Sequence, residues 1–405
     1  MPPVQAPIQS RSLAALKRTQ AQSFLGPAGL DAWLLAVRES SERPDPALRY
    51  FVDQDFTWNS YFLITPARAY ALVATFDAPD LLAAGIFDEV RTYKEGPKAA
   101  LLALLGECDP RRIGINVSKD DALADGLTAG LRDALVGALG GTPYEHRLES
   151  AEGLVGRLRG VKLPEEQAVI RRAVDETEEI FDRVSREIRV GMTARELAAR
   201  FHARIDAAGV RTAWPRRHCP TVTVGAAAPV GHVGPGEERI THGCIVHTDF
   251  GIVRDGYCSD LQRLWYVAPK GRRDAPEPVQ AAYAAIVQSI EAGARALTAG
   301  TEGWKVDDAA RASLVAKGYP EYAHALGHHL GRAVHDGGGV LGPRWERYGN
   351  EPFRTVEVGH VYTLEPSVHL PEHGLVSLEE DVVVTDRGVE FLSRFPRALP
   401  ILSLD

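Results

Sequence analysis

Two aspartates, Asp249 and Asp260, lie on neighbouring segments with strand character and constrain this chain more than any other feature. Residues 245–250 and 260–267 are rich in β-branched and aromatic side chains, and the turn sequence Asp255-Gly256 lies between them. A chain reversal there would place both carboxylates in one cleft, with a register set by the turn. Asp-Gly sequences are also ordinary turns, so the pair alone does not establish a metal site.

Three more side chains of metal-ligand type follow downstream, in the order His328, Glu365 and Glu379. Taken singly, His328 could belong to a glycine-rich surface loop, and either glutamate could be a solvated strand end. Together with the two aspartates they give four carboxylates and one imidazole, and buried carboxylates repel one another unless positive charge lies between them. Two divalent cations over one water would supply that charge, so the set predicts a metal-dependent hydrolase.

The sequence around these residues favours the same interpretation. Glycines flank His328, which is typical of close backbone approach at a site. The adjacent His329 is expected to pack or to face solvent rather than to bind metal. Pro366 restricts Glu365 to an extended conformation at the end of an apolar strand, so that its side chain projects in a defined direction.

Composition excludes several classes of protein. The chain has 405 residues with 45% hydrophobic content, enough for a large core in two or three domains. A net charge of −8 leaves no basic footprint for nucleic acid or an anionic membrane. There is no apolar run of about 18 residues and no apolar core of a secretory signal. The four cysteines show no paired spacing, which is typical of a reduced cytoplasmic protein.

Residues 1–155 alternate between strand-like and helix-like segments, which predicts an α/β domain after a loose arm or short helix in the first 20 residues. The strands are expected at 34–37, 60–63, 70–74 and 113–116, and the helices at 98–105 and 123–139.

In the second part of the chain an amphipathic helix is expected to begin at Pro164 and to end before Gly191, with an interruption of its apolar stripe near Thr177. Thr193 and Glu196 have the spacing of a capping box for the next helix. Further helices are expected at 278–297 and 306–317, and strands at 221–224, 245–250, 260–267, 361–364 and 375–385.

The five candidate positions, in type, order and neighbourhood, resemble the pita-bread metallopeptidases: methionine aminopeptidase, aminopeptidase P, prolidase and the metal-free creatinases. The resemblance is strong over residues 155–395 and is one of pattern only over the first 150. It implies an α/β (α+β) fold with a creatinase-like N-terminal domain at 1–155 and a pita-bread catalytic domain at 156–405.

The resemblance also implies that Asp249, Asp260, His328, Glu365 and Glu379 bind two divalent metal ions. Asp260 and Glu379 would bridge the ions, Asp249 would hold the first, and His328 with Glu365 would hold the second. Such an oxygen-rich set suits Mn, Co or Zn. Glu365 would also carry a proton to the leaving amine.

Two histidines outside this set, His232 and His335, match positions that contact the substrate and the tetrahedral intermediate in the family; the alternative is a structural role. The chain departs from the family at Ser377, where an arginine is common, and at His329, where many relatives carry glycine. The first departure puts a substrate contact in doubt, but not metal binding.

The extra N-terminal domain and the pair His335-Asp336, where methionine aminopeptidases carry His-Glu, indicate the proline-specific branch. The expected substrate is a small peptide with proline at its second position. A dipeptidase must also bind the free carboxylate of that proline, for which arginine is suited. Arg344, Arg347 and Arg354 lie between the downstream ligands, although each could be a solvated loop residue. We expect a dipeptidase, with aminopeptidase P as the alternative.

Two other functions remain as alternatives, a creatinase-like amidinohydrolase and a non-catalytic binding relative. Retention of all five ligand types argues against both. Relatives with the N-terminal domain commonly form homodimers, so we expect a homodimer with no nucleic-acid or membrane partner. Phe56, Trp58 and Tyr61 are the aromatic residues expected either at that interface or in the local core.

Overall fold

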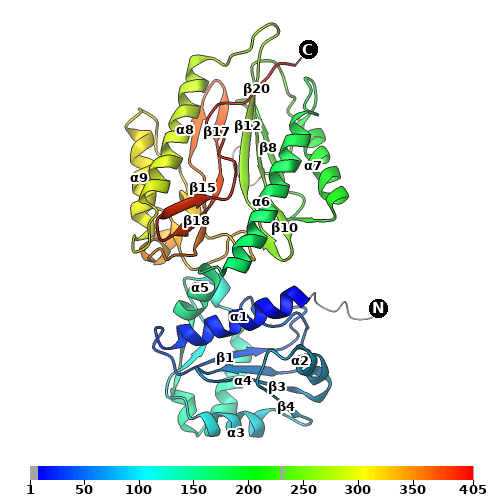
Figure 1. The fold of residues 1–405 in the computed structure, drawn as a ribbon, viewed down its shortest axis with the longest axis vertical. Helices are drawn as coiled ribbons and strands as arrows, with labels where there is room; N and C mark the ends of the chain where they lie inside the picture. The colour runs from blue at the N-terminus through cyan, green and yellow to red at the C-terminus, as the bar shows by residue number, and fades with distance from the viewer. Residues whose placement is uncertain (1–7, 229–230, 232, 405) are drawn as a thin grey trace. The chain divides into compact units, whose positions relative to one another are not determined.

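Figure 1 shows a computed structural model of the chain, which describes residues 8–228, 231 and 233–404. The chain divides into two compact units, Met1–Arg159 and Gly160–Asp405. The boundary expected between residues 155 and 156 lies inside helix α5 (Glu152–Gly160), and the observed division falls between Arg159 and Gly160, at the last residue of that helix. The mixed α/β architecture agrees with the expected fold class.

The N-terminal unit contains a six-stranded mixed sheet in the order β4-β3-β2-β1-β5-β6. Its central strands are fully buried, so they are continuous apolar runs rather than alternating ones, as expected for a sheet covered on both faces. The strands are β1 (Ala32–Val37), β2 (Ser60–Ile64), β3 (Ala69–Ala74), β4 (Glu89–Tyr93), β5 (Ile113–Ile115) and β6 (Leu148–Ser150).

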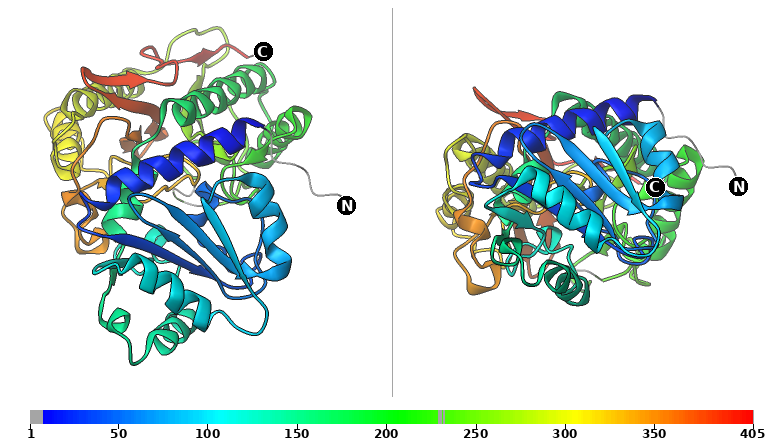
Figure 2. Two further views of the ribbon diagram at one scale, coloured as in Figure 1. Left: turned by 60° about the horizontal axis from the view of Figure 1, so that its bottom comes forward. Right: turned by 90° about the horizontal axis from the view of Figure 1, so that it is seen from below.

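Helices cover both faces of this sheet. Helices α1 (Ile8–Leu25), α2 (Ala78–Ala84) and α5 pack on one face, and α3 (Lys98–Cys108) and α4 (Ala129–Leu139) on the other; Figure 2 shows α1 crossing its face. The helix expected at 123–139 is wrong in its first part. Residues Ala122–Ala124 form a 3-10 turn, and Thr128 caps α4 by accepting the N–H of Leu131, so the helix begins later.

The aromatic residues of this unit divide between core and surface. Phe56 and Tyr61 are buried, and the Phe56 ring lies 5.1 Å from that of Phe62. These two residues therefore belong to the local core, whereas Trp58 is 62% exposed.

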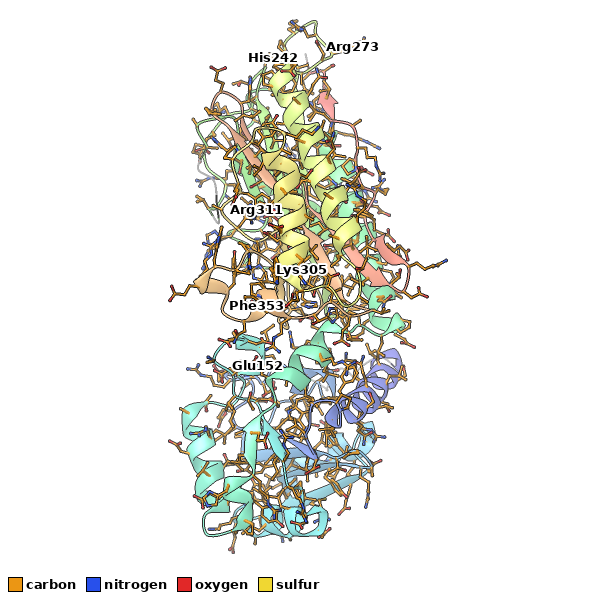
Figure 3. The ribbon with its side chains drawn as sticks, turned by 90° about the vertical axis from the view of Figure 1, so that its left-hand side faces the viewer. Glu152, His242, Arg273, Lys305, Arg311 and Phe353 are labelled. Atoms are coloured by element: carbon orange, nitrogen blue, oxygen red, sulfur yellow. The ribbon has the colours of Figure 1, made fainter. Side chains whose placement is uncertain are left out.

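The C-terminal unit packs largely antiparallel sheets between two pairs of helices (Figure 1). Helices α6 (Pro164–Ser185) and α7 (Ala194–Ala208) cover one side, and α8 (Glu277–Ala296) and α9 (Gly303–Val315) the other. Figure 3 shows α8 and α9 side by side, with Lys305 and Arg311 on α9. The principal strands are β8 (Thr221–Val224), β9 (Ile245–Phe250), β12 (Leu261–Val267), β15 (Val361–Leu364), β18 (Glu380–Thr385), β19 (Gly388–Phe391) and β20 (Ile401–Leu402).

The helix starts expected at Pro164 and after Thr193 are confirmed, whereas the helix expected from 306 begins at Gly303. Pro164 opens α6, and the Glu166 carboxylate accepts the N–H of Leu163. Thr193 and Glu196 form the capping box of α7. The interruption of the α6 stripe at Thr177 has a reason, because its buried hydroxyl lies 2.7 Å from that of Ser259.

The strand expected at 375–385 is instead two strands. Strand β17 (Gly374–Ser377) pairs with β16 (Ser367–Leu370), whereas β18 pairs with β15. Between them the N–H of Glu379 bonds to the carbonyl of Gln262 on β12, 3.3 Å away. The chain therefore changes sheets at Glu379, and this break brings Glu379 to the aspartate-bearing strands.

Short strands complete the unit: β7 (Arg211–Thr212), β10 (Ile252–Arg254), β11 (Tyr257–Cys258), β13 (Gly327–His328) and β14 (Val340–Leu341). Among the residues that the structure describes, no helix is both long enough and apolar enough to cross a membrane.

Candidate metal centre

The two aspartates meet because β9 pairs antiparallel with β12, with Asp249 opposite Gln262. The hairpin β10–β11 makes the reversal through Asp255 and Gly256, whose φ values of 49° and 83° are those of a type I′ turn. Asp260 immediately precedes β12, and its buried carboxyl group lies close enough to that of Asp249 for the two groups to influence each other's pKa. The predicted reversal is thus present.

The downstream residues reach the same place from other strands. On β13, His328 places its Nε2 3.5 Å from Glu365 Oε1, 3.7 Å from Asp260 Oδ2 and 4.0 Å from Glu379 Oε1. Asp260, His328 and Glu379 can each offer one ligand atom such that these atoms all lie within 4.8 Å of one another. The structure therefore brings together all five residues selected from the sequence, which we call the five-residue cluster.

The cluster leaves buried oxygen atoms without partners. Asp249 Oδ1, Asp260 Oδ1 and Glu379 Oε1 are buried and have no hydrogen-bond partner among the described residues. A buried unsatisfied acceptor costs about 1–3 kcal/mol, and more when charged. Four carboxylates with one imidazole are hard donors of the kind that divalent cations prefer, so the residues fit a metal site.

Burial perturbs the acids and the imidazole of the cluster in opposite directions. Burial raises the pKa of Asp249 to about 7, and burial together with the Asp249 carboxylate raises the pKa of Asp260 well above its usual value. The pKa values of Glu365 and Glu379 are likewise raised, first by burial and then by neighbouring carboxylates. Burial, with His335 nearby, lowers the pKa of His328 to about 3.

These shifts predict that the metal-free protein loses stability as pH rises. The folded state holds the carboxyl protons more tightly than the unfolded chain, whose acids titrate near about pH 4. The contribution of the carboxyl groups to stability is complete below that pH and is lost as pH rises through about 7, the pKa of Asp249. His328, whose pKa is lowered to about 3, acts in the opposite sense below about pH 6.5, but it is one group against four carboxyls. A pKa difference of one corresponds to about 1.4 kcal/mol, so we expect a decrease of several kcal/mol.

Urea unfolding of chelator-treated protein between pH 5 and 8 would measure this decrease. Metal-loaded protein is the control and should show a much flatter dependence, because a bound cation favours the ionised carboxylates. Equal pH dependence with and without metal would contradict the expectation.

A layer of buried charge lies behind the cluster. The Asp381 carboxylate accepts the N–H of Asp260 at 3.1 Å. Arg263 donates to the carbonyls of Gln262 and Glu379 and pairs with the Glu380 carboxylate, each at 2.9 Å. Arg263 was not predicted from the sequence, although a charged residue within the apolar run of 261–267 was a visible signal.

The loop after His328 places a second histidine beside the cluster. His335 is exposed, and its ring meets that of His328 edge-on, with centroids 4.4 Å apart. Next to it, Asp336 pairs with Lys162 at 2.9 Å with both side chains fully buried, and accepts the N–H of Ala333. This ion pair anchors the loop. The other predicted histidine, His232, lies outside the described residues.

His329 and Ser377 have structural surroundings. His329 is buried and its ring packs 4.1 Å from that of Tyr362, as expected for a packing residue. Ser377 is buried and donates its hydroxyl to the carbonyl of Pro366 at 3.1 Å.

The three candidate arginines lie at the loops that follow β14. The exposed guanidinium of Arg344 lies over the Trp304 ring at 4.3 Å. Arg347, also exposed, lies over the Trp345 ring at 4.6 Å and donates to the carbonyl of Ala323. Arg354 is half-buried against Gly339.

Known proteins show the same fold. A Xaa-Pro dipeptidase from Bacillus anthracis superposes with a TM-score of 0.75 and 24% identity, covering 96% of this chain and 100% of that one. An X-Pro aminopeptidase from Thermotoga maritima MSB8 gives a TM-score of 0.72 and 24% identity, covering 95% and 100%. The uncharacterized peptidase YqhT of Bacillus subtilis (strain 168) is 26% identical over 249 residues, which are 61% of this chain and 66% of YqhT.

The family model described as Metallopeptidase family M24 matches residues 168–386, which is more than half of the chain and includes the whole five-residue cluster. The expectation of a pita-bread metallopeptidase is thereby confirmed, and the chain belongs to metallopeptidase family M24.

Proposed function

We propose that this protein hydrolyses Xaa-Pro peptide bonds with two divalent metal ions, and that dipeptides are its preferred substrates. The observation that carries the proposal is the five-residue cluster, in which three buried carboxylate oxygens have no partner among the described residues. Such a set is costly to fold without cations, and the acids are too many to serve only as general acids or bases.

In this proposal Asp249 would hold the first ion, His328 with Glu365 would hold the second, and Asp260 and Glu379 would be shared between them. Mn, Co or Zn suits the donors. Divalent ions held by these residues would supply a water of lowered pKa and a polarised scissile carbonyl. Glu365 would carry a proton to the leaving nitrogen of proline, since its Oε1 lies in the cluster, 3.5 Å from His328 Nε2.

Two histidines complete the proposed mechanism. His335 is exposed yet touches the His328 ring, so it can donate a hydrogen bond to the developing oxyanion beside the cluster. His232 is proposed for substrate contact from its position in the sequence.

The choice of substrate rests on the relatives and on the arginines. The two solved structures described above share the fold of this chain, and their names include both a dipeptidase and an aminopeptidase. A dipeptidase requires a cation for the free carboxylate. We favour Arg347 for this role, because its contacts lead back toward Glu365. Arg347 donates to the carbonyl of Ala323. The next residue, His324, bonds to Ser367, two residues after Glu365.

The test compares hydrolysis of Ala-Pro, Ala-Pro-Ala and Ala-Ala by chelated protein, before and after addition of Mn²⁺, Co²⁺ or Zn²⁺. We expect Ala-Pro to be cleaved only with metal, Ala-Pro-Ala more slowly, and Ala-Ala least. Faster cleavage of Ala-Pro-Ala would favour the aminopeptidase. Undiminished hydrolysis of Ala-Pro after chelation would contradict the whole proposal.

Arg347→Ala is expected to raise KM for Ala-Pro with little change in kcat. A charge-assisted hydrogen bond contributes about 1.5–3 kcal/mol, so KM should increase roughly 10- to 100-fold. Arg344→Ala and Arg354→Ala are the matched controls and should change KM much less. If one of them gives the larger increase instead, that arginine binds the carboxylate.

His335→Ala is expected to retain the metal content of the wild type while kcat falls by about 100-fold, as for loss of an oxyanion donor. Metal analysis and steady-state kinetics on the same preparation measure both quantities. Loss of metal together with activity would show that His335 supports the cluster instead.

We also propose a homodimer in a reducing compartment such as the cytoplasm. The exposed Trp58 and Phe76 of the N-terminal unit, 62% and 95% exposed, support an interface, and the four cysteines are unpaired. Sedimentation as a monomer at micromolar concentration would contradict the dimer.

A further inference from the structure

A buried histidine that the proposed mechanism does not use lies on the same strand as Asp249. His247 is two residues before Asp249 on β9, so both side chains project from the same face of the sheet. The imidazole is 3% exposed and lies diagonally across from Gln262 on β12, because β12 pairs Gln262 with Asp249 and Leu264 with His247.

Hydrogen bonds connect this histidine to the proposed proton carrier. His247 Nε2 lies 3.0 Å from Gln262 Oε1, and Gln262 Nε2 donates to Glu365 Oε2 at 3.3 Å. The other oxygen of Glu365, Oε1, lies 3.5 Å from both His328 Nε2 and the Thr363 hydroxyl. One carboxylate oxygen is thus turned toward the ligand imidazole and the other is bound by the amide.

Donor and acceptor chemistry gives this series of hydrogen bonds a direction. When Glu365 binds a cation its carboxylate is ionised and only accepts hydrogen bonds, so the amide nitrogen of Gln262 must face Glu365. The amide oxygen then faces His247, which must donate from Nε2. The remaining nitrogen, Nδ1, is buried and has no hydrogen-bond partner among the described residues, which is consistent with an unprotonated Nδ1.

We propose that His247 and Gln262 are positioning residues, which fix the orientation of the Glu365 carboxylate relative to the metal-binding residues. His247 acts through Gln262, because without a donor at its oxygen the amide could rotate and present that oxygen to Glu365, where it would repel the carboxylate. The inference rests on the function proposed above, since it assigns the support of Glu365 in that reaction.

The test compares four variants: His247→Leu, which removes the donor; His247→Gln, whose amide nitrogen can replace Nε2; Gln262→Met, which removes the middle link; and the double variant H247L/Q262M. His242→Leu is the control for an exposed histidine of the same unit: among the described residues its ring bonds a backbone carbonyl, that of Ala268, and Figure 3 labels it near Arg273 at one end of the unit.

With Mn²⁺-loaded protein and Ala-Pro, His247→Leu and Gln262→Met should each lower kcat by about 10-fold or more, as for loss of groups that orient metal ligands, with KM nearly unchanged. His247→Gln should restore most of kcat. The kcat of the double variant should be no lower than that of Gln262→Met, because the two residues act in the same series of hydrogen bonds. Equal impairment in His247→Leu and His247→Gln would reduce the role to packing and overturn the proposal.

A second measurement does not depend on turnover. The visible absorption spectrum of Co²⁺-loaded protein reports the ligand geometry; His247→Leu should shift it, whereas His247→Gln and His242→Leu should match the wild type. An unshifted spectrum in His247→Leu would overturn the positioning role. If wild type fails to cleave Ala-Pro, the proposed function fails, and the cobalt spectra still decide this inference. A wild-type protein that binds no Co²⁺ would overturn both.

Discussion

Asp260→Asn should abolish most of the activity while leaving a folded protein. The substitution removes a negative charge proposed to bridge two cations, so at least one ion should be lost. A metal ion contributes several kcal/mol to transition-state stabilisation and about 1.4 kcal/mol is tenfold in rate, so kcat should fall at least about 100-fold. Metal analysis and kinetics on the same sample measure both effects.

The metal-free forms provide an independent check. Burial and the Asp249 carboxylate penalise an ionised Asp260, so a neutral Asn should be tolerated when no metal is bound. Metal-free Asp260→Asn should therefore be at least as stable as metal-free wild type at pH 8. Asp386→Asn, which changes an acid 84% exposed in the same unit, is the control and should alter neither metal content nor rate. Full metal content and full turnover in Asp260→Asn would show that Asp260 is not a ligand.

Arg263→Met should produce the largest loss of stability. Arg263 pairs with Glu380, whose side chain is completely buried, and also donates to two carbonyls next to the cluster. Arg263 also pairs with Glu178 at 3.2 Å, but Glu178 has a second partner in Arg394, 2.7 Å away. Loss of Arg263 should therefore leave the uncompensated charge on Glu380. Removing one partner of a buried ion pair costs about 3–5 kcal/mol, and urea unfolding of the metal-free protein should show a decrease of that size.

Two further variants isolate the cause. Arg171→Met removes an arginine from an exposed pair with Glu390, with side chains 41% and 58% exposed, and should cost less than about 1 kcal/mol. The double variant R263M/E380Q should recover part of the lost stability, because it removes the unpaired charge. If R263M and R171M unfold alike, the buried pair contributes little.

Local sequence signals predicted the elements that depend on neighbouring residues. The strand at 245–250 and the capping box at Thr193 and Glu196 are present as expected, since apolar pattern and cap chemistry act over a few residues. The start predicted for the helix at 123–139 was wrong, because Thr128 caps the helix and so places its first residue later than the apolar pattern predicts. The strand expected at 375–385 failed because pairing with two different sheets, not propensity, divides it at Glu379.

The sequence by itself determined the donor set and the class of chemistry. The five residue types and their order can be read directly from the amino-acid sequence, and the matching family model spans all five positions. The tertiary structure decided what supports them. Arg263 behind the strands, Lys162 with Asp336 under the histidine loop, and the path from His247 through Gln262 to Glu365 join residues far apart in the chain. Such contacts arise from strand pairing and packing between distant segments, which local periodicity does not encode.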